Sequence, residues 1–207
     1  MPRRTGSSQR WRTRQERDIY VEQANRAGWR SRAVFKLEQI QAKERLLKPG
    51  TVCVDLGSAP GSWSQLAAQL VAPRGYVVAV DLLTMESIPG VEFLQADFTS
   101  PKAVAQLKQL LGGRAVDLVM SDMAPNISGN RAMDQPRSVA LLEQALLFAT
   151  EVLRPGGDLL VKAFQGEGID AFTRDLRRHF ATVKTIKPKA SRAESREIYL
   201  LARTYRM

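Results

Sequence analysis

The chain has 207 residues and a formal net charge of +10, with 44% hydrophobic and 25% charged residues. These values are typical of a globular protein, and the length suits one domain with short extensions. No apolar run approaches the roughly 18 residues of a membrane-spanning helix, and the basic N-terminus is not followed by the apolar segment of a secretory signal. The one cysteine, Cys53, and the lack of a Cys/His cluster exclude an intrachain disulfide and a zinc site. We therefore expect a soluble, cytoplasmic protein without a metal.

The positive charge is concentrated at the two ends of the chain. Residues 1–50 carry 13 Lys and Arg against 5 Asp and Glu, and residues 174–207 carry 10 against 3, whereas residues 51–173 carry 8 against 13. Two solvated basic surfaces would account for the excess of Lys and Arg. A polyanionic partner would also account for the concentration of this positive charge at the two ends of the chain. A membrane surface is a weaker explanation, because the basic N-terminal stretch has no sustained apolar face.

The first fifty residues are predicted to form a tail and two helices. Residues 1–14 are polar and Arg-rich, as expected of a basic flexible tail. Helices are predicted at 15–27 and 31–46, with Gly28 between them. We expect residues 15–207 to form a single domain.

From residue 51 onwards, short β-rich runs alternate with helical patterns. The predicted strands are 51–55, 75–80, 91–95, 115–121, 157–163, 181–187 and 196–202. The predicted helices are 62–71, 101–111, 137–153 and 168–179. This alternation favours an α/β fold with a doubly wound, mostly parallel sheet of seven strands and helices on both faces. No long helix separates the last two runs, so we expect an antiparallel pair at the C-terminal edge of the sheet.

A glycine-rich segment, Val54-Asp-Leu-Gly-Ser-Ala-Pro-Gly-Ser-Trp63, follows the first predicted strand and opens a helix. Gly57 and Gly61 allow the backbone to turn sharply and approach a ligand, and the helix presents free N–H groups. The segment lacks the G-x-G-x-x-G pattern of dinucleotide-binding proteins. Its D-x-G-x-x-P-G-x-x-S spacing, which includes Pro60, resembles the first motif of the S-adenosylmethionine-dependent methyltransferases that act on RNA ribose.

Three aspartates are predicted at the ends of successive strands, where the ligand crevice of an open α/β sheet lies. Asp55 could bind an ammonium group near the loop. Asp81 could accept hydrogen bonds from both hydroxyls of a nucleoside, and Asp97 could accept one from an adenine amino group. Trp63 either packs on the cofactor or covers the sheet as an ordinary helix residue.

Charged side chains near the remaining strands suggest a catalytic centre. The fourth strand runs into Ser121-Asp-Met-Ala-Pro-Asn126, which places Asp122 beside the methyl donor. Lys162 lies among apolar residues in the fifth strand, where a lysine is rare without a role or a partner, unless it reaches water from the strand's exposed end. Glu197 begins the last strand, and Lys36 lies in the helix before the first strand.

From about Tyr20 to Arg203, the chain closely resembles the RrmJ/FtsJ family of ribose 2'-O-methyltransferases. The shared motifs are Gly28-Trp-Arg-Ser-Arg-Ala33, Asp55-Leu-Gly-Ser-Ala-Pro-Gly61, Ser121-Asp-Met-Ala-Pro-Asn126, Val161-Lys-Ala-Phe-Gln-Gly-Glu-Gly168 and Ser191-Arg-Ala-Glu-Ser-Arg-Glu-Ile-Tyr199. The resemblance implies a Rossmann-like class I methyltransferase domain, with N-terminal helices over 15–48 that carry Lys36 and a cofactor-binding and catalytic sheet over 51–207.

The resemblance also assigns the site, with S-adenosylmethionine as methyl donor. It implies a catalytic Lys-Asp-Lys-Glu tetrad made of Lys36, Asp122, Lys162 and Glu197. Together with the arguments above, it gives as cofactor-binding residues Asp55, Gly57, Pro60, Gly61, Trp63, Asp81, Asp97 and Asp122.

Methyl transfer from a sulfonium to oxygen is an in-line displacement, for which orientation lowers much of the barrier. A ribose hydroxyl is a weak nucleophile, so its proton must be removed or its developing charge stabilised. We expect Lys162 to do this, with Lys36 disfavouring its charged form and with Asp122 and Glu197 orienting the ammonium groups. Because the carboxylates favour a charged lysine, a general base and an electrostatic steering group are both open roles for Lys162.

The predicted function is methylation of a uridine 2'-hydroxyl in large-subunit (23S-type) ribosomal RNA, by a monomer acting on the large ribosomal subunit. A transfer RNA or an mRNA cap is the alternative substrate, since the tetrad would contact a hydroxyl and a sulfonium and would not distinguish one RNA sequence from another. The compact length and the whole-chain resemblance favour ribosomal RNA. A non-catalytic ribosome-assembly or RNA-binding factor is a further alternative, although the tetrad is complete.

The RNA-binding surface is predicted from the basic residues near the tetrad. Arg30, Arg32, Lys36 and the 184–196 segment, with Lys187, Lys189 and Arg192, are expected to contact phosphates on either side of the target nucleotide. Additional non-specific affinity, or merely a solvated surface, is expected from Arg12, Arg14 and Arg17.

Overall fold

A computed structural model describes residues 19–125 and 128–206. The predicted tail 1–14, the start of the predicted helix 15–27, and Arg12, Arg14 and Arg17 lie outside the described residues. The elements are, in chain order, α2 Ile19–Arg26, α3 Val34–Glu44, β1 Val52–Leu56, α4 Ser62–Val71, β2 Tyr76–Asp81, β3 Val91–Gln95, α5 Pro101–Leu111, β4 Val116–Ser121, α6 Arg131–Val152, β5 Leu153–Phe164, α7 Ile169–His179, β6 Phe180–Ile186 and β7 Glu197–Tyr205.

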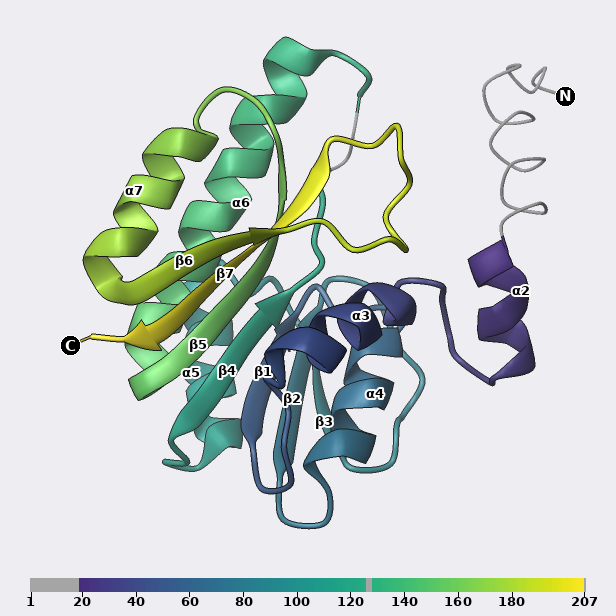
Figure 1. Ribbon diagram of the computed structural model, residues 1–207. Coiled ribbons are helices and arrows are strands. Elements are labelled where there is room, and N and C mark those ends of the chain that lie inside the picture. Colours follow the sequence, from purple (N-terminus) through teal and green to yellow (C-terminus); the bar gives the residue numbers. More distant parts are fainter. Residues whose placement is uncertain (1–18, 126–127, 207) are drawn as a thin grey trace, which may run out of the picture.

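Within these residues, seven strands form one sheet in the order β3-β2-β1-β4-β5-β7-β6 (Figure 1). β1 to β5 pair in parallel, and β7 runs antiparallel to both of its neighbours. The predicted α/β, Rossmann-like fold is therefore confirmed, including the antiparallel pair at the C-terminal edge. The prediction did not include the insertion of β7 between β5 and β6. This insertion pairs Glu197 with Phe164 and Tyr199 with Lys162.

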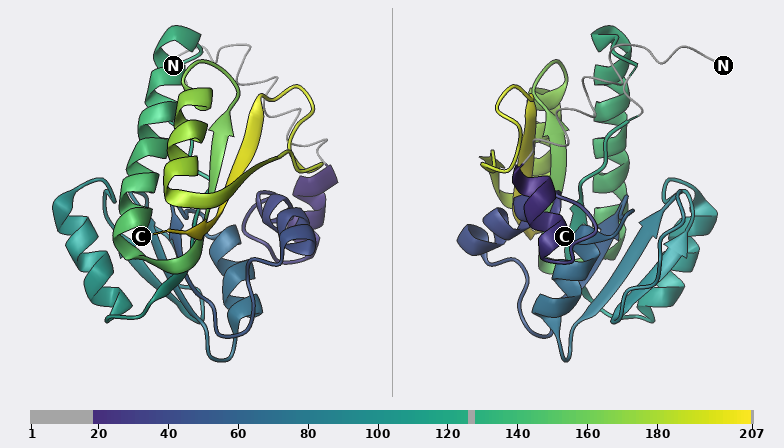
Figure 2. Two further views of the ribbon diagram at one scale, coloured as in Figure 1. Left: turned by 60° about the vertical axis from the view of Figure 1, so that its left-hand side comes forward. Right: turned by 90° about the vertical axis from the view of Figure 1, so that its right-hand side faces the viewer.

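Helices cover both faces of the sheet, as predicted (Figure 2). α3 and α4 pack on one face, where Leu37 and Ile40 are fully buried against strand residues such as Leu160. α5, α6 and α7 pack on the other face. The central strands are buried on both sides, which explains why β2 reads as a nearly continuous apolar run rather than as an alternating one.

One helix begins earlier than predicted. The helical pattern predicted this helix over 137–153, so that it begins just after Pro136, and a proline in a helix interior lacks the N–H and clashes with the preceding turn. In the structure α6 begins at Arg131, and Pro136 lies in its second turn. The Asn130 side chain caps this start by accepting a hydrogen bond from the Ala132 N–H at 3.1 Å. The helix is thus anchored ahead of the proline, and the early turns reach the carboxyl end of β5.

One strand also begins earlier than predicted. β5 starts at Leu153 rather than 157, with a shift in its pairing to β4 between Val116 and Leu118. The Pro155-Gly156 pair inside it concealed this first part of the strand. An ion pair from Arg154 Nε to Asp117 Oδ1, at 2.6 Å, fixes the irregular start.

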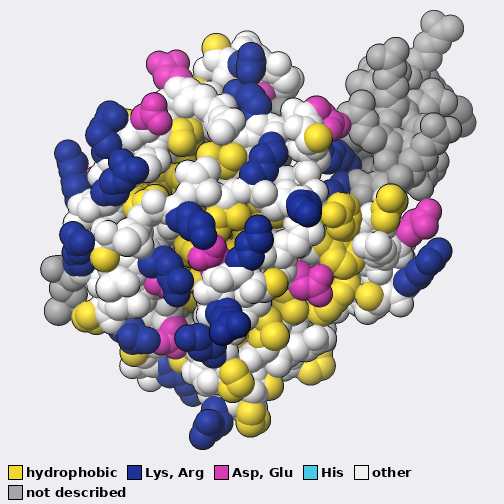
Figure 3. Space-filling model, viewed as in Figure 1, with side chains coloured by type: hydrophobic (Ala, Val, Ile, Leu, Met, Phe, Trp, Pro, Cys, Tyr) yellow, Lys and Arg dark blue, Asp and Glu magenta, His cyan; other side chains and the backbone are white. Residues whose placement is uncertain are grey.

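The surface is strongly basic on one side. In the view of Figure 3, Lys and Arg side chains spread over the face that β6, β7 and α7 present, with fewer Asp and Glu side chains among them. None of the helices over 19–125 and 128–206 is long and apolar enough to cross a membrane.

Candidate active site

The four residues of the predicted tetrad come together at one edge of the sheet. They reach it from α3 (Lys36), from the segment after β4 (Asp122), from β5 (Lys162) and from the start of β7 (Glu197). Lys162 Nζ lies 3.3 Å from Asp122 Oδ1 and also donates to the Asp122 carbonyl oxygen. Lys36 Nζ lies 2.8 Å and 2.9 Å from the two carboxylate oxygens of Glu197, and 3.7 Å from Asp122 Oδ1. Asp122 therefore sits between the two lysines, and positive and negative groups alternate.

All four side chains of the tetrad are largely buried. The side chains of Lys162, Glu197, Lys36 and Asp122 are only 9%, 11%, 12% and 17% exposed. Removing charges from water costs free energy, so such groups are retained where they pair with one another or serve a function. The alternative of an exposed Lys162 that extends into solvent is therefore not what the structure contains.

Tyr199 joins the tetrad, although its side chain was not singled out from the sequence. Its hydroxyl donates to Asp122 Oδ1, and its fully buried ring packs on Trp63 with a centroid distance of 5.7 Å. Burial, followed by the nearby carboxylates of Asp122 and Glu197, raises the pKa of Tyr199. The phenol thus remains a hydrogen-bond donor. Strand periodicity could have identified it, because residues two apart in a strand share a face.

Ser191 is a second residue that the sequence reasoning did not use. Its hydroxyl donates to Glu197 Oε1 at 2.7 Å, and the serine is buried. Glu197 is thereby held from both sides, by Ser191 and by Lys36. The loop that precedes β7 consequently fixes one end of the tetrad.

The Gly57–Gly61 loop lies at the carboxyl ends of β1 and β2. Gly57 has φ +72°, and a Cβ at this position would lie 2.0 Å from the Cγ of Met123, so no other residue fits there without rearrangement. Asp81 holds the loop: its two carboxylate oxygens accept from the Ala59 N–H at 2.9 Å and from the Leu83 N–H at 2.8 Å. The sequence pattern thus produces a tight loop fixed to the next strand.

The other two predicted aspartates, in β1 and after β3, have contrasting environments. Asp55 is 1% exposed and accepts from the Ser64 hydroxyl at 2.6 Å. Burial, reinforced by the charges of Asp122 and Asp81, raises the pKa of Asp55 to about 7 despite that hydrogen bond. Asp97 is exposed, and its Oδ1 accepts from the N–H and hydroxyl of Thr99.

These groups fit S-adenosylmethionine. The cofactor has an ammonium group, a ribose diol and an adenine amine, all hydrogen-bond donors, and carboxylates at three successive strand ends match them. The buried Ser58 hydroxyl, which has no partner among the described residues, adds a further unused polar group to the loop. No group of three or more His, Cys, Asp and Glu residues in the described ranges could hold a metal.

Two predicted residues have mainly structural contacts here. Trp63 is 3% exposed, and its indole N–H donates to the Ala33 carbonyl at 2.8 Å, which favours a packing role over direct contact with the cofactor. Arg30, expected on RNA phosphates, donates to three backbone carbonyls: those of Pro60 at 3.1 Å, Glu86 at 2.8 Å and Ser87 at 2.9 Å. Arg30 therefore ties the Gly57–Gly61 loop to the 86–87 segment.

The other residues of the predicted RNA surface lie nearer the tetrad. Arg32 donates to the Ala190 carbonyl, so α3 is attached to the loop before β7. Lys187 donates to the Ser195 carbonyl of the same loop. Arg32 and Arg192 line a cavity of about 450 Å³ whose wall includes Lys36 and Glu197. Two basic residues of the predicted RNA surface and two of the four tetrad residues therefore line the same cavity.

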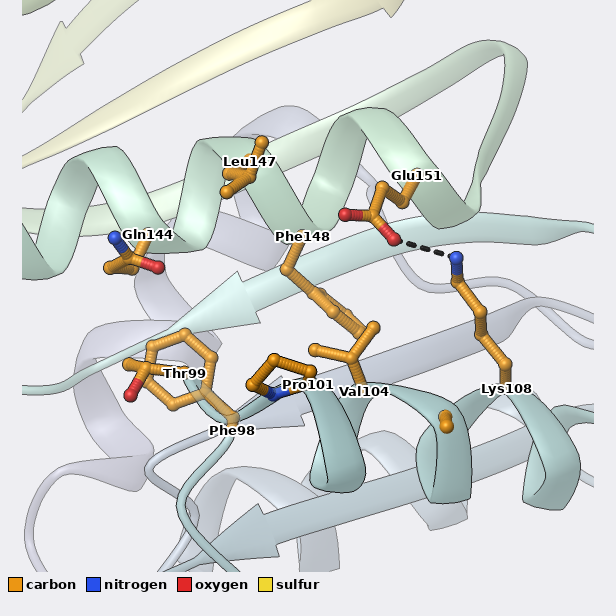
Figure 4. A pocket seen from close by; sticks show the side chains of 10 residues that line it. Phe98, Thr99, Pro101, Val104, Lys108, Gln144, Leu147, Phe148 and Glu151 are labelled. Atoms are coloured by element: carbon orange, nitrogen blue, oxygen red, sulfur yellow. Dashed lines mark hydrogen bonds and ion pairs between the residues drawn. The ribbon is translucent and has the colours of Figure 1, made fainter.

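A separate groove lies between α5 and α6 (Figure 4). Its walls are mainly apolar, with Phe98, Val104 and Phe148 facing one another, and the ion pair between Lys108 and Glu151 spans its end at 2.6 Å. None of the tetrad residues lines it. We do not include this groove in the candidate site.

Comparison with known proteins identifies the family of this chain and several similar proteins. The family model described as FtsJ-like methyltransferase matches residues 29–205. The chain is 56% identical to the ribosomal RNA large subunit methyltransferase E of Alkalilimnicola ehrlichii, over 98% of this chain and 97% of that protein. It is 52% identical to the protein of the same name from Pseudomonas aeruginosa, over 98% of each. A structure from Plasmodium falciparum, assigned as a ribosomal RNA methyltransferase, has a TM-score of 0.78 at 29% identity and covers 86% of this chain and 98% of that one. The chain belongs to the FtsJ-like methyltransferase family.

Proposed function

We propose that the protein transfers a methyl group from S-adenosylmethionine to the ribose 2'-hydroxyl of a uridine in large-subunit ribosomal RNA. The observation that carries this proposal is the buried, charge-balanced tetrad beside the Gly57–Gly61 loop. Two relatives at 52% and 56% identity are named for methylation of this class of RNA. The basic face suits a polyanion. Action as a cytoplasmic monomer belongs to the same proposal.

The cofactor is expected at the carboxyl ends of β1, β2 and β3. Asp55 would hold its ammonium group, Asp81 its ribose and Asp97 its adenine amine, while the positive φ angles of Gly57 and Gly61 set the tight course of the loop beside it. When bound, S-adenosylmethionine supplies a methyl group activated by a sulfonium. Asp122 lies at the boundary between this part of the site and the tetrad, since β4 neighbours β1 on one side and β5 on the other.

Lys162 is the proposed partner of the acceptor hydroxyl. Two hydrogen-bond acceptors of Asp122 surround its ammonium group, which leaves a third N–H for the ribose oxygen. Both protein contacts suit a charged ammonium, so we propose electrostatic steering rather than proton abstraction. Lys162 would orient the oxygen for in-line displacement and stabilise the negative charge that develops as the hydroxyl proton is released to water.

The remaining groups keep Lys162 in place. Asp122 Oδ1 accepts a hydrogen bond from the Tyr199 hydroxyl and also faces the Lys162 ammonium group. The Asp122 carboxylate therefore has little freedom to rotate. Glu197 fixes Lys36, whose charge lies 3.7 Å from Asp122 Oδ1. This chain of contacts holds the reacting geometry before the substrate arrives, which is how enzymes obtain large electrostatic effects.

The experiment is methyl transfer from labelled S-adenosylmethionine to three RNAs: large ribosomal subunits that lack the modification, deproteinised ribosomal RNA and bulk transfer RNA. We expect label on large-subunit RNA. Label on transfer RNA alone would leave the chemistry standing but replace the substrate. Cofactor binding without label on these three RNAs, or on a capped mRNA assayed in the same way, would favour a non-catalytic assembly or RNA-binding factor and contradict the proposal.

A further inference from the structure

A second cavity adjoins the tetrad on the side away from the cofactor loop. It has a volume of about 270 Å³ and lies between the start of α6 and the end of β5, with Phe164, Gln135, Arg131 and Arg196 among its lining residues. Ser195 lines both this cavity and the larger one beside Lys36 and Glu197. The sheet order separates it from the cofactor site, since β4 and β5 lie between it and β1.

The position of this cavity relative to the reacting group follows from the strand register. Phe164 lies two residues after Lys162 in β5, which is roughly 7 Å along the strand. It also pairs directly with Glu197 across to β7. The cavity therefore lies about one nucleotide away from the place where the acceptor ribose would react.

The lining chemistry suits a nucleotide. Phe164 is half-buried and lines the cavity, and a base of any sequence can stack on an aromatic side chain. Arg131 is exposed in the first turn of α6 and makes no hydrogen bond or ion pair with the residues that the structure describes. Arg196 donates through Nη1 to the Gln165 carbonyl at 2.9 Å, and its other N–H groups remain for a phosphate.

One acidic residue also lines the cavity, and its charge is already engaged. The Asp134 carboxylate accepts from the Ser128 N–H and hydroxyl, both at 2.9 Å, and from the Gly129 N–H at 3.0 Å. Gln135 is likewise fixed, because its amide group donates to the carbonyls of Phe164 and Glu167. The walls are therefore set before any ligand binds.

We propose that this cavity binds the nucleotide next to the methylated one, with its base on Phe164 and its phosphates near Arg131 and Arg196. The inference rests on the proposed function. The methylated nucleotide would enter through the larger cavity, which Lys36 and Glu197 line, with its 2'-hydroxyl directed beyond that wall toward Lys162. Ser195 would lie between the two bases. Because the cavities lie on the α3 side and the α6 side of β7, neighbouring bases must separate, so the RNA binds as a single strand rather than as a stacked duplex.

The first test is steady-state methylation of unmodified large ribosomal subunits by the full chain. Phe164→Ala should raise the KM for RNA by about 5- to 100-fold, with cofactor affinity unchanged, and Phe164→Tyr should restore most of the loss. Arg131→Ala and Arg196→Ala should each weaken RNA binding and lower the slope of log K against log salt by about 1. Arg74→Ala, which removes an exposed cation just before β2, at the amino ends of the strands, is the matched control and should change neither quantity.

The second test locates the bound nucleotide. Ultraviolet cross-linking of Phe164→Tyr to the RNA, followed by mass analysis, should join this residue to a nucleotide adjacent to the methylated one. A cross-link to the methylated nucleotide itself, or to one further away, would overturn the inference. So would unchanged RNA affinity in all three alanine variants while the wild-type chain methylates RNA normally. If the wild-type chain methylates no RNA, the proposed function fails first and this inference with it.

Discussion

The two halves of the site are built in different ways. In the half proposed to bind the cofactor, the hydrogen bonds of the carboxylates span few positions: two from Asp97 to Thr99, nine from Asp55 to Ser64 and 22 from Asp81 to Ala59. In the catalytic half, the contacts join distant segments: Lys36 bonds Glu197 across 161 positions, and Tyr199 bonds Asp122 across 77. The catalytic half can thus exist only after α3, β4, β5 and β7 have packed together. Methyl transfer should therefore be more sensitive than cofactor binding to single changes in these contacts.

The largest expected effect is a loss of methyl transfer without a loss of cofactor binding. Lys162→Ala removes the group that faces the acceptor hydroxyl, and we expect single-turnover methylation to slow by about 1,000-fold. The dissociation constant for S-adenosylmethionine should stay within about two-fold, because the carboxylates around the cofactor loop are untouched. Rapid-quench kinetics and calorimetry measure the two quantities. Lys108→Ala, which removes an exposed lysine in a surface ion pair, is the control; near-normal turnover in Lys162→Ala would refute the assigned role.

A smaller loss of activity is expected when a hydrogen bond that holds the tetrad in place is removed. Tyr199→Phe keeps the ring on Trp63 but deletes the hydroxyl that bonds Asp122, and the lost hydrogen bond to a charged group corresponds to roughly a 10- to 100-fold fall in kcat. Tyr205→Phe deletes a hydroxyl that bonds the Thr150 carbonyl, far from the tetrad, and should leave kcat unchanged. Equal behaviour of the two variants would mean that the Tyr199 hydroxyl serves stability alone.

The cofactor half should respond to pH through Asp55. Its folded pKa of about 7 is above the value of about 3.9 in an unfolded chain. The folded state therefore holds the proton more tightly, and stability contributed by Asp55 is fully present below pH 4 and is lost as pH rises through about 7. Asp55→Asn should consequently make the cofactor-free protein more stable than wild type above pH 7, with the difference vanishing below pH 4. Denaturant unfolding across this range measures it.

Cofactor binding should depend on pH in the opposite sense to stability, becoming stronger as pH rises. An ammonium group near Asp55 favours the ionised carboxylate, so binding of S-adenosylmethionine near pH 6.5 should release protons, and affinity should rise between roughly pH 5 and pH 8. In Asp55→Asn the proton release should disappear, and affinity at pH 8 should fall about 10-fold. Calorimetry in buffers of different ionisation enthalpy detects the protons. Proton release that persists in Asp55→Asn would assign it to another group.

The smallest effect concerns Arg30, which joins the Gly57–Gly61 loop to the 86–87 segment. Arg30→Ala removes three hydrogen bonds to backbone carbonyls at the cofactor loop and the 86–87 segment, so the KM for S-adenosylmethionine should rise several-fold, about 3- to 10-fold. The KM for RNA should change little. Arg26→Ala removes an exposed arginine that pairs with Glu22 and serves as the comparison. A rise in the RNA KM alone would return Arg30 to the phosphate-binding surface.

Much of the fold could be predicted from the sequence because its signals are local. The strands and helices follow from runs of apolar residues with clear breaks, and the loop at Gly57 follows from its glycine spacing. The tetrad was predicted through motifs shared with a known family, and the structure brings its four residues together.

Other features depend on contacts that no local pattern contains. The insertion of β7 between β5 and β6 sets Tyr199 opposite Lys162, and nothing in the spacing of the last two runs distinguishes this from a simple edge pair. Arg30 looks like a phosphate ligand in a basic stretch, but the fold brings the Pro60 and Ser87 carbonyls to it. α6 begins at Arg131 rather than at 137, because the Asn130 cap supports turns ahead of Pro136 that the predicted helical pattern did not include.

The central claim is that the tetrad directs a methyl group to a ribose oxygen rather than to a base. The most direct test is nucleoside mass spectrometry of large-subunit RNA methylated by the purified protein, combined with alkaline hydrolysis, since a 2'-O-methyl group blocks cleavage of the adjacent phosphodiester. We predict 2'-O-methyluridine within an alkali-resistant dinucleotide, and none with Lys162→Ala. A methylated base with an alkali-sensitive backbone would contradict the account.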